Sequence, residues 1–267
     1  MKHLLILLSI LLLSSPLFGQ SNTKQWTKQL GTSSDDKGRG VTTDPSGNIY
    51  VTGETRGNLD GNTNSGRNDI FLVKYNSSGT KQWTKQLGTS SLDWGNDVTT
   101  DSSGNIYVTG FTDGGLDGNT NSQGTLDDIF LVKYNSSGTK QWTKQLGYYS
   151  EQGTGVTTDS SGNIYVTGHT QGCNSCSTVM ATRGLDGNTN LGYLDIFLVK
   201  YNSSGTKQWT KQLGTSSWDE GKDVTTDSSG NIYVTGETGG SLDGNTNTNS
   251  GSQDIFLVKY DSSGTKQ

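Results

Sequence analysis

The chain has 267 residues, among them 38 glycines, two prolines and two cysteines, and its formal net charge is −5 at pH 7. This length suits one domain of an all-β type. Binding to phosphate backbones needs a basic surface, so the acidic balance argues against a nucleic-acid partner.

The first twenty residues have the pattern of a secretory signal peptide. Lys2 and His3 precede an apolar run from Leu4 to Leu13, and small residues follow up to Gly19. The run is shorter than the roughly 20 residues that cross a bilayer, and no later segment is apolar enough to be a membrane span. We therefore expect export, removal of residues 1–20, and a mature domain of residues 21–267 in the periplasm, at the cell surface or outside the cell.

Four short runs with β-type composition recur along the rest of the chain, in the order KQWTKQLG, VTTD, NIYVTG and DIFLVKY. Val, Ile, Thr, Tyr, Phe and Trp dominate them, and turn residues separate them. The KQWTKQLG copies begin at Lys24, Lys81, Lys140 and Lys207. The copies of the other three runs begin at Val41, Val98, Val156 and Val224, at Asn48, Asn105, Asn163 and Asn231, and at Asp69, Asp128, Asp195 and Asp254.

Tight turns connect these runs in every copy. Pro/Ser-Ser-Gly follows VTTD and Asn/Asp-Ser-Ser-Gly follows DIFLVKY, and the glycine supplies the positive φ of a short hairpin. Each unit is therefore predicted to be an antiparallel meander with KQWTKQLG outermost. DIFLVKY is apolar on both faces, which indicates sheets covered on both sides. The pattern predicts an all-β fold, a β-propeller of four blades with four antiparallel strands each.

The repeat begins and ends within a unit. One KQWTKQLG run, in residues 22–31, precedes the first VTTD, and Thr265–Gln267 begin a further copy. We expect residues 22–31 to supply the fourth strand of the last blade and close the ring, which would make the protein a monomer. The alternative is an incomplete ring that belongs to an assembly with further blades.

VTTDSSGNIYVTG followed by DIFLVKYNSSGTKQW resembles the bacterial β-propeller repeat family called SBBP and is more distantly similar to NHL repeats. The resemblance extends over essentially all of residues 21–267. It implies a propeller in an exported or surface protein of bacterial type, and it implies no catalytic residues. The family name refers to seven-bladed propellers, so the four repeats of this chain leave the number of blades open.

The copies differ mainly in the loops after the second strand and between blades, which an up-and-down blade places on one face of the ring. Binding commonly resides in such loops on a rigid scaffold. Aromatic and acidic residues gather in the loops between blades and suit a carbohydrate or protein ligand. The alternative is that these rings pack under their own loops. The candidate ligand-binding residues are Asp93, Trp94, Tyr148, Tyr149, Trp218 and Asp219.

Each loop after a second strand contains LDGNTN, in which Asp, Asn and Asn alternate as the oxygen ligands of a calcium loop do. The glycine after the third ligand and the bidentate glutamate are absent, and Asp-Gly and Asn also form ordinary turns. Ca²⁺ is the one cofactor that the sequence suggests. The candidate ligands are Asp60, Asn62, Asn64, Asp69, Asp117, Asn119, Asn121, Asp128, Asp186, Asn188, Asn190, Asp195, Asp243, Asn245, Asn247 and Asp254.

Both cysteines lie in an insertion of the third unit. In an exported protein Cys173 and Cys176 are expected to form a local disulfide, because a redox site needs a βαβ context and two thiolates alone do not make a zinc site. His169 has no partner fixed by the sequence and is interpreted as structural or solvated.

No Gly-x-Ser-x-Gly elbow or Cys–His pairing is visible, so we expect no catalytic residues. The first hypothesis is an exported, non-enzymatic propeller that recognises a protein or glycan through its variable loops, with calcium ordering them. Two alternatives stay open. One is a secreted glycan-active enzyme, a hydrolase or lyase, that uses carboxylates on the same face. The other is a structural envelope or matrix protein whose repeats assemble further.

Overall fold

The computed structural model describes residues 24–122, 124, 126–172, 184–248 and 252–267. The predicted signal peptide and the predicted disulfide between Cys173 and Cys176 lie outside the described residues. Within these ranges, no helix combines the length and the apolar character needed to cross a membrane.

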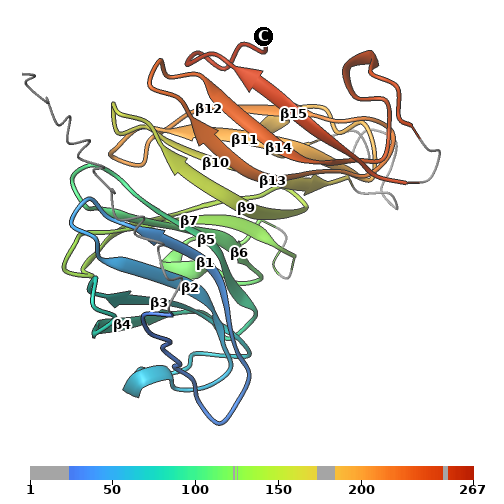
Figure 1. Cartoon of the computed structure of the whole chain (residues 1–267). Helices are drawn as coiled ribbons and strands as arrows, with labels where there is room; N and C mark the ends of the chain where they lie inside the picture. The colour runs from blue at the N-terminus through green and yellow to red at the C-terminus, as the bar shows by residue number, and fades with distance from the viewer. Residues whose placement is uncertain (1–23, 123, 125, 173–183, 249–251) are drawn as a thin grey trace, which may run out of the picture.

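The described residues form four antiparallel sheets, which we call blades one to four, in chain order (Figure 1). Blade one contains β1 (Asp36–Thr43), β2 (Ile49–Thr55), β3 (Asp69–Tyr75) and β4 (Lys81–Leu87). Blade two contains β5 (Asp93–Thr100), β6 (Ile106–Thr112), β7 (Asp128–Tyr134) and β8 (Lys140–Leu146). Blade three contains β9 (Ser150–Thr158), β10 (Ile164–Gln171), β11 (Leu194–Tyr201) and β12 (Lys207–Leu213), and blade four contains β13 (Asp219–Thr226), β14 (Ile232–Thr238) and β15 (Asp254–Tyr260). Single 3₁₀ turns η1 to η4 lie at Leu59–Gly61, Leu116–Gly118, Leu185–Gly187 and Leu242–Gly244.

The turn between the first two strands of each blade is held by one aspartate. In blade one, Asp44 accepts hydrogen bonds from the Ser46 and Asn48 amides, both at 2.9 Å, and from the Tyr50 hydroxyl at 2.9 Å. Gly47 completes the turn with φ of 77°. The same contacts recur in every blade, which explains why the copies keep the aspartate, glycine, asparagine and tyrosine of this stretch. The equivalent aspartates are Asp101, Asp159 and Asp227.

A bulge in each innermost strand requires a glycine on the strand beside it. In blade one the register of β1 against β2 shifts between Gly38 and Gly40. A Cβ atom on Gly53 would lie 1.8 Å from the Lys37 carbonyl oxygen, so no larger residue fits. The bulge bends the inner strand, and the same glycine recurs as Gly110, Gly168 and Gly236.

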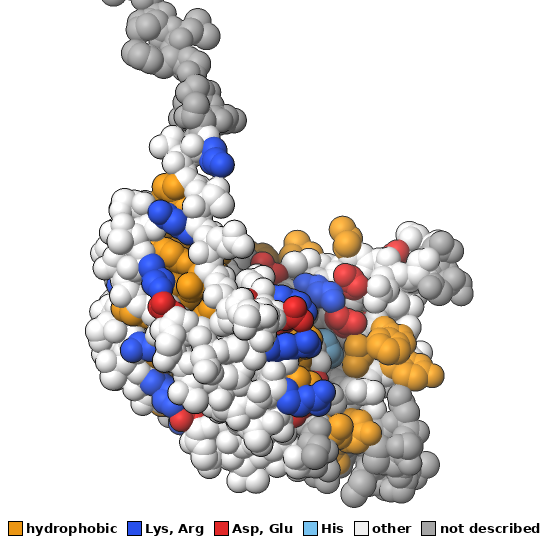
Figure 2. Space-filling model, turned by 90° about the horizontal axis from the view of Figure 1, so that it is seen from below, with side chains coloured by type: hydrophobic (Ala, Val, Ile, Leu, Met, Phe, Trp, Pro, Cys, Tyr) orange, Lys and Arg blue, Asp and Glu red, His pale blue; other side chains and the backbone are white. Residues whose placement is uncertain are grey.

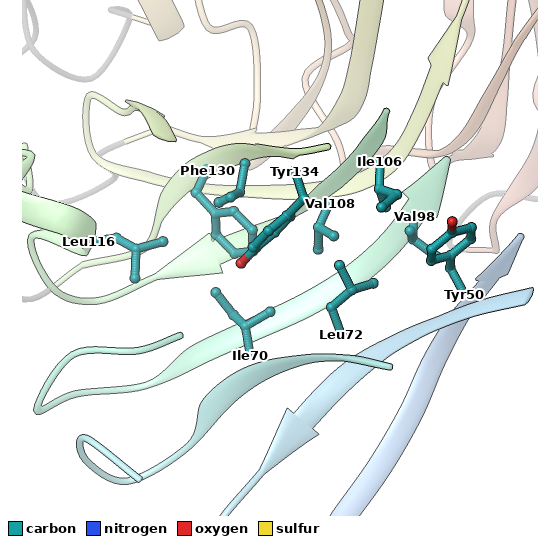
Figure 3. Packing of buried hydrophobic residues seen from close by; sticks show 10 residues of the cluster. Tyr50, Ile70, Leu72, Val98, Ile106, Val108, Leu116, Phe130 and Tyr134 are labelled. Atoms are coloured by element: carbon teal, nitrogen blue, oxygen red, sulfur yellow. The ribbon is translucent and has the colours of Figure 1, made fainter. Parts of the chain in front are cut away.

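The core lies between the blades, where side chains of neighbouring sheets interdigitate (Figure 3). Ile70 and Leu72 of blade one point toward Val98, Ile106 and Val108 of blade two, and all five are nearly inaccessible to solvent. Burying each such side chain contributes about 1.5–3 kcal/mol. Equivalent clusters join blade two to three and blade three to four.

The structure does not show the ring closure that the sequence predicted. Blade four has only three strands, residues 24–32 belong to no strand, and blades one and four lie at opposite ends of the arc (Figure 1). At these ends Val41 is 68% exposed and Leu257 is 73% exposed, whereas their counterparts Val98 and Leu72 are buried. Blade four and blade one therefore do not pack against each other within the described part of one chain. The packing between neighbouring blades determines how strongly the arc curves, and the number of repeats does not.

Candidate functional site

Residues that differ between the copies meet on the concave inner side of the arc. The first two strands of every blade share most residues, but some positions carry different side chains, and three of these positions supply residues to this side. Two of these positions lie on the innermost strand, on either side of the glycine at its bulge, and the third lies near the end of the second strand. The three sets are Lys37, Trp94, Gln152 and Glu220; Arg39, Asn96, Thr154 and Lys222; and Glu54, Phe111, His169 and Glu237.

Nine of these side chains line one hollow of about 410 Å³, which we call the axial hollow. Its volume lies in the range of small-molecule sites. Figure 2 shows acidic and basic side chains gathered around a histidine on this face, with hydrophobic side chains beside them. All four blades contribute to the axial hollow, through Arg39, Trp94, Asn96, Phe111, Gln152, Thr154, His169, Glu220 and Lys222.

Arg39 and Trp94 form the side of the hollow nearest blade one. The Arg39 guanidinium carbon lies 4.4 Å from the centre of the Trp94 ring, close enough for a cation–π contact. Its Nε and Nη2 donate to the two oxygens of the buried Glu54 carboxylate at 2.5 and 3.0 Å. Phe111 packs on Trp94 with ring centroids 5.1 Å apart. These contacts hold the Trp94 ring and the Arg39 charge in fixed positions.

His169 lies on the opposite side of the hollow with its side chain only 14% exposed. Burial lowers its pKa, while the nearby Glu220 carboxylate opposes that shift, so the ring is neutral at pH 7. Its Nδ1 lies 3.9 Å from Glu220 Oε2, too far for a hydrogen bond, and Lys222 Nζ lies 2.6 Å from the same oxygen. His169 Nδ1 is therefore a buried polar atom without a hydrogen-bond partner among the described residues.

A pair of carboxyl groups lies beside this part of the hollow. Burial, together with a hydrogen bond to Asp127 and the charge of Asp127, raises the pKa of Asp113 to about 7. Gln152 Nε2 donates to Asp127 at 2.5 Å, and Gln152 is paired with His169 in the β9–β10 register. Burial and the neighbouring carboxylate thus favour the protonated form of Asp113.

The structure separates the residues that the sequence predicted as ligand-binding. Trp94 lines the axial hollow, but Asp93 and Asp219 are fully buried and hold the loops between blades. Asp93 accepts from the Thr89 amide at 2.6 Å, and Asp219 accepts from the Thr215 amide at 2.6 Å. Neither aspartate is open to a surface ligand.

The predicted tyrosines and Trp218 have other settings. The amides of Tyr148 and Tyr149 donate to Glu151, which takes the place of the loop aspartate in blade three. Trp218 is half exposed and stacks on Tyr193 with ring centroids 5.7 Å apart. The sequence reasoning did not select Tyr193, because it looked for aromatic residues in the loops between blades. Tyr193 lies in the loop between the second and third strands of blade three.

The LDGNTN aspartates already have cationic partners. Asp60 pairs with Lys81 and accepts from the Thr84 hydroxyl at 2.7 Å, and Asp117 pairs with Lys140 in the same way. The aspartate that opens the third strand has different partners: Asp69 accepts from the Ser65 amide and from Gln86. Among the described residues no group of three or more His, Cys, Asp or Glu could hold a metal ion. Asx-turn and ion-pair roles account for these loops.

The SBBP β-propeller repeat profile matches residues 25–60, 82–117, 141–174 and 208–243. The chain belongs to this family. This SBBP protein is 27% identical over 262 residues to an uncharacterized WD repeat-containing protein of Acanthamoeba polyphaga mimivirus, a match covering 79% of the chain and 18% of that relative. It is 25% identical over 208 residues to the regulatory protein FlaEY of Caulobacter vibrioides, covering 72% of the chain and 21% of FlaEY.

Two solved structures are similar to this SBBP chain at lower identity. One is a protein of unknown function from Bacteroides caccae, with a TM-score of 0.45, 11% identity and coverage of 86% of this chain and 65% of the other. The other is an ulvan lyase of polysaccharide lyase family PL25, with a TM-score of 0.46, 13% identity and coverage of 88% and 57%. The chain thus spans less than two thirds of the length of all four proteins.

Sequence reasoning missed most of the axial hollow of this SBBP chain. It selected loops, whereas Arg39, Gln152 and Lys222 lie within strands, and it interpreted His169 as structural or solvated. The signal was present in the sequence, because all nine residues that line the hollow occupy strand positions at which the four copies differ. Aligning the four copies residue by residue finds them.

Proposed function

We propose that this SBBP protein is an exported, non-enzymatic scaffold that binds a glycan in the axial hollow. The observation that carries the proposal is the placement of the differences between copies. Strands that share most of their residues in all four blades carry Lys37, Trp94, Gln152 and Glu220 at one inward position. A purely structural role does not require this position to vary.

The chemistry of the hollow suits a polyhydroxylated ligand. Arg39 and Lys222 offer donors and Glu220 offers an acceptor. The Thr154 hydroxyl donates to the Gly221 carbonyl oxygen at 2.7 Å and can accept from a ligand. Sugar hydroxyls can donate and accept at once, so they can satisfy this mixture without carrying a net charge. The Trp94 ring, fixed by Arg39 and Phe111, adds apolar contact area at low entropic cost. A peptide ligand is the competing outcome.

The test is binding of residues 21–267 to immobilised neutral, uronic-acid and sulfated oligosaccharides and to an unrelated peptide panel. The decisive variant is Trp94→Lys with Phe111→Glu, which gives blade two the residues that blade one carries at these positions, Lys37 and Glu54, and circular dichroism checks that it is folded. The matched control is Pro45→Ser, which copies the turn of the other blades on the opposite face.

Loss of oligosaccharide binding in the double variant, with binding retained in the control, is the expected result. Retention in both variants would refute the axial hollow as the site. Binding only to peptides would refute the glycan assignment.

A second candidate function has one specific observation in its favour. The Asp113–Asp127 pair, with a pKa of about 7 for Asp113, is suited to acid–base chemistry on a bound glycan. Release of new reducing ends or unsaturated products by the wild-type protein, abolished by Asp113→Asn, would establish an enzyme and refute the non-enzymatic scaffold. Binding without product release is the outcome expected here.

A further inference from the structure

We propose that two copies of this chain join head to tail into one closed ring of eight blades. In this ring, residues 26–30 of each copy form most of the fourth strand of the other copy's blade four. The proposal concerns the two ends of the arc and is independent of the ligand in the axial hollow. Four observations support it: an unpaired strand edge, a strand segment already placed to fill it, complementary apolar surfaces, and an alternating polar contact.

The outer edge of β15 lacks the strand that every other blade has there. In blade one, Lys81 pairs with Tyr75 and Trp83 pairs with Lys74 on the edge of β3. In blade four, Lys266 pairs with Tyr260 in the same manner, and the rest of the β15 edge has no partner strand in the described chain. The same register would place Trp26 of the second copy opposite Lys259, Thr27 opposite Val258 and Leu30 opposite Ile255.

Residues 26–30 already lie where the fourth strand of a preceding blade would lie. An added Cβ on Gly79 of blade one would lie 2.9 Å from the Trp26 ring. The same distance separates Gly138 of blade two from Trp83, the fourth-strand tryptophan of the blade before it. Leu30 packs on Leu59, Phe71 and Val73 as Leu87 packs on their counterparts in blade two. Residues 26–30 therefore pack on blade one as a fourth strand does, but they are not paired with a third strand.

The two ends of the arc carry the two halves of one interblade core. Each internal contact is built from a tyrosine, an isoleucine and a leucine of one blade against two valines and an isoleucine of the next. At the free end of blade four Ile255 is 90% exposed and Leu257 is 73% exposed. At the free end of blade one Val41 is 68% exposed, and Ile49 and Val51 are only partly covered. A second copy is the partner whose surface matches both halves.

A polar contact alternates around the arc and fits an even number of blades. One inner position carries Gly40, Asp97, Gly155 and Asp223 in successive blades. Asp97 reaches across to blade three, where it accepts from the Val156 amide at 2.8 Å beside Gly155. Among the described residues no blade follows Asp223, whereas Gly40 and Val41 at the other end offer the same glycine and amide. Head-to-tail closure of two copies continues the alternation without a break.

Closure by a second copy joins unlike ends of the two chains. The interface is heterologous, so each copy uses its blade-four end against the blade-one end of the other, and two such contacts close a ring. Eight blades lie within the usual range of propellers. Closure would also remove the exposed edge of β15, which is otherwise a site for uncontrolled strand pairing.

The test is sedimentation equilibrium of residues 21–267 at micromolar concentration, with Leu257→Arg, Thr27→Pro and Leu191→Arg as variants. Leu257 is exposed in the single chain and Thr27 lies in no strand, so neither substitution should alter the fold of one copy. Leu191 is 57% exposed in a loop away from both ends and is the matched control. Circular dichroism checks that each variant is folded.

The expected result is a mass of two chains for the wild type and for Leu191→Arg, and complete loss of the dimer in Leu257→Arg and Thr27→Pro. Hydrogen exchange should show protected amides along β15 in the dimer and exposed ones in either monomeric variant. A monomeric wild type would overturn the proposal. A series of growing oligomers would overturn the closed ring, and a dimer that survives both substitutions would overturn the strand pairing.

Discussion

Asp93 links the loop between blades one and two to the sheet of blade two. Its buried carboxylate accepts from the Thr89 amide at 2.6 Å, from the Thr89 hydroxyl at 2.9 Å and from the Thr112 hydroxyl. Asp93→Ala would leave the two Thr89 donors without an acceptor, whereas the Thr112 hydroxyl can turn to the Gly114 carbonyl oxygen at 3.2 Å. Each buried unsatisfied donor costs about 1–3 kcal/mol, so we expect the free energy of unfolding to fall by about 3 kcal/mol. For a domain of this size the melting temperature should then fall by about 6–12 °C.

Two assays measure the change. Calorimetry gives the melting temperature, and urea denaturation monitored by tryptophan fluorescence gives the free energy of unfolding. Asp35→Ala is the matched control, because the Asp35 side chain is 65% exposed and pairs only with Arg56 at the surface. That substitution should change the free energy of unfolding by less than about 0.5 kcal/mol. The reasoning is refuted if Asp93→Ala melts with the wild type, and a ligand-binding role for Asp93 would instead lower affinity at unchanged stability.

Two further predictions concern pH and calcium. Burial raises the pKa of Glu151 to about 7 and that of Asp97 to about 6, so both carboxyl groups ionise more easily in the unfolded chain. Their contribution to stability is present at low pH and is lost as pH rises from the ordinary carboxyl pKa of the unfolded chain to these values. Urea midpoints should therefore fall from about pH 4 to pH 7, less steeply in Glu151→Gln; a rising midpoint would contradict this. Melting curves in calcium and in EDTA should superimpose, because Asp60 is already paired with Lys81; a site occupied at 100 times its dissociation constant would instead add about 2.7 kcal/mol.

The strands and blades followed from the sequence because local rules determine them. β-branched runs, glycine turns such as the one at Gly47, and two apolar faces on DIFLVKY each require an antiparallel, stacked sheet. The closure of the ring did not follow, because it depends on the angle between neighbouring blades. That angle is set by how Ile70 and Leu72 pack against Val98 and Ile106. The number of repeats in the sequence does not determine this packing.

The axial hollow was harder to predict for a different reason. Trp94 was identified as an aromatic residue in a loop, but it lies at the start of β5, where the bulge next to Gly95 turns its side chain. The bulge cannot be read from the sequence of one strand alone, since it needs Gly110 on the next strand. A Cβ atom at Gly110 would lie 1.8 Å from the Trp94 carbonyl oxygen.

Repetition separates the residues that stabilise this protein from those that can vary. Each blade contacts only its neighbours, so stability is close to a sum of similar interblade contacts, as in other repeat proteins. Side chains such as Gln152 and Lys222 face the hollow and stay outside those clusters, so they can change without disturbing the stack. The two ends of the described arc lack this contact, and Ile255 and Val41 are exposed there. Pairing these ends through a second copy, as proposed above, would bury both side chains.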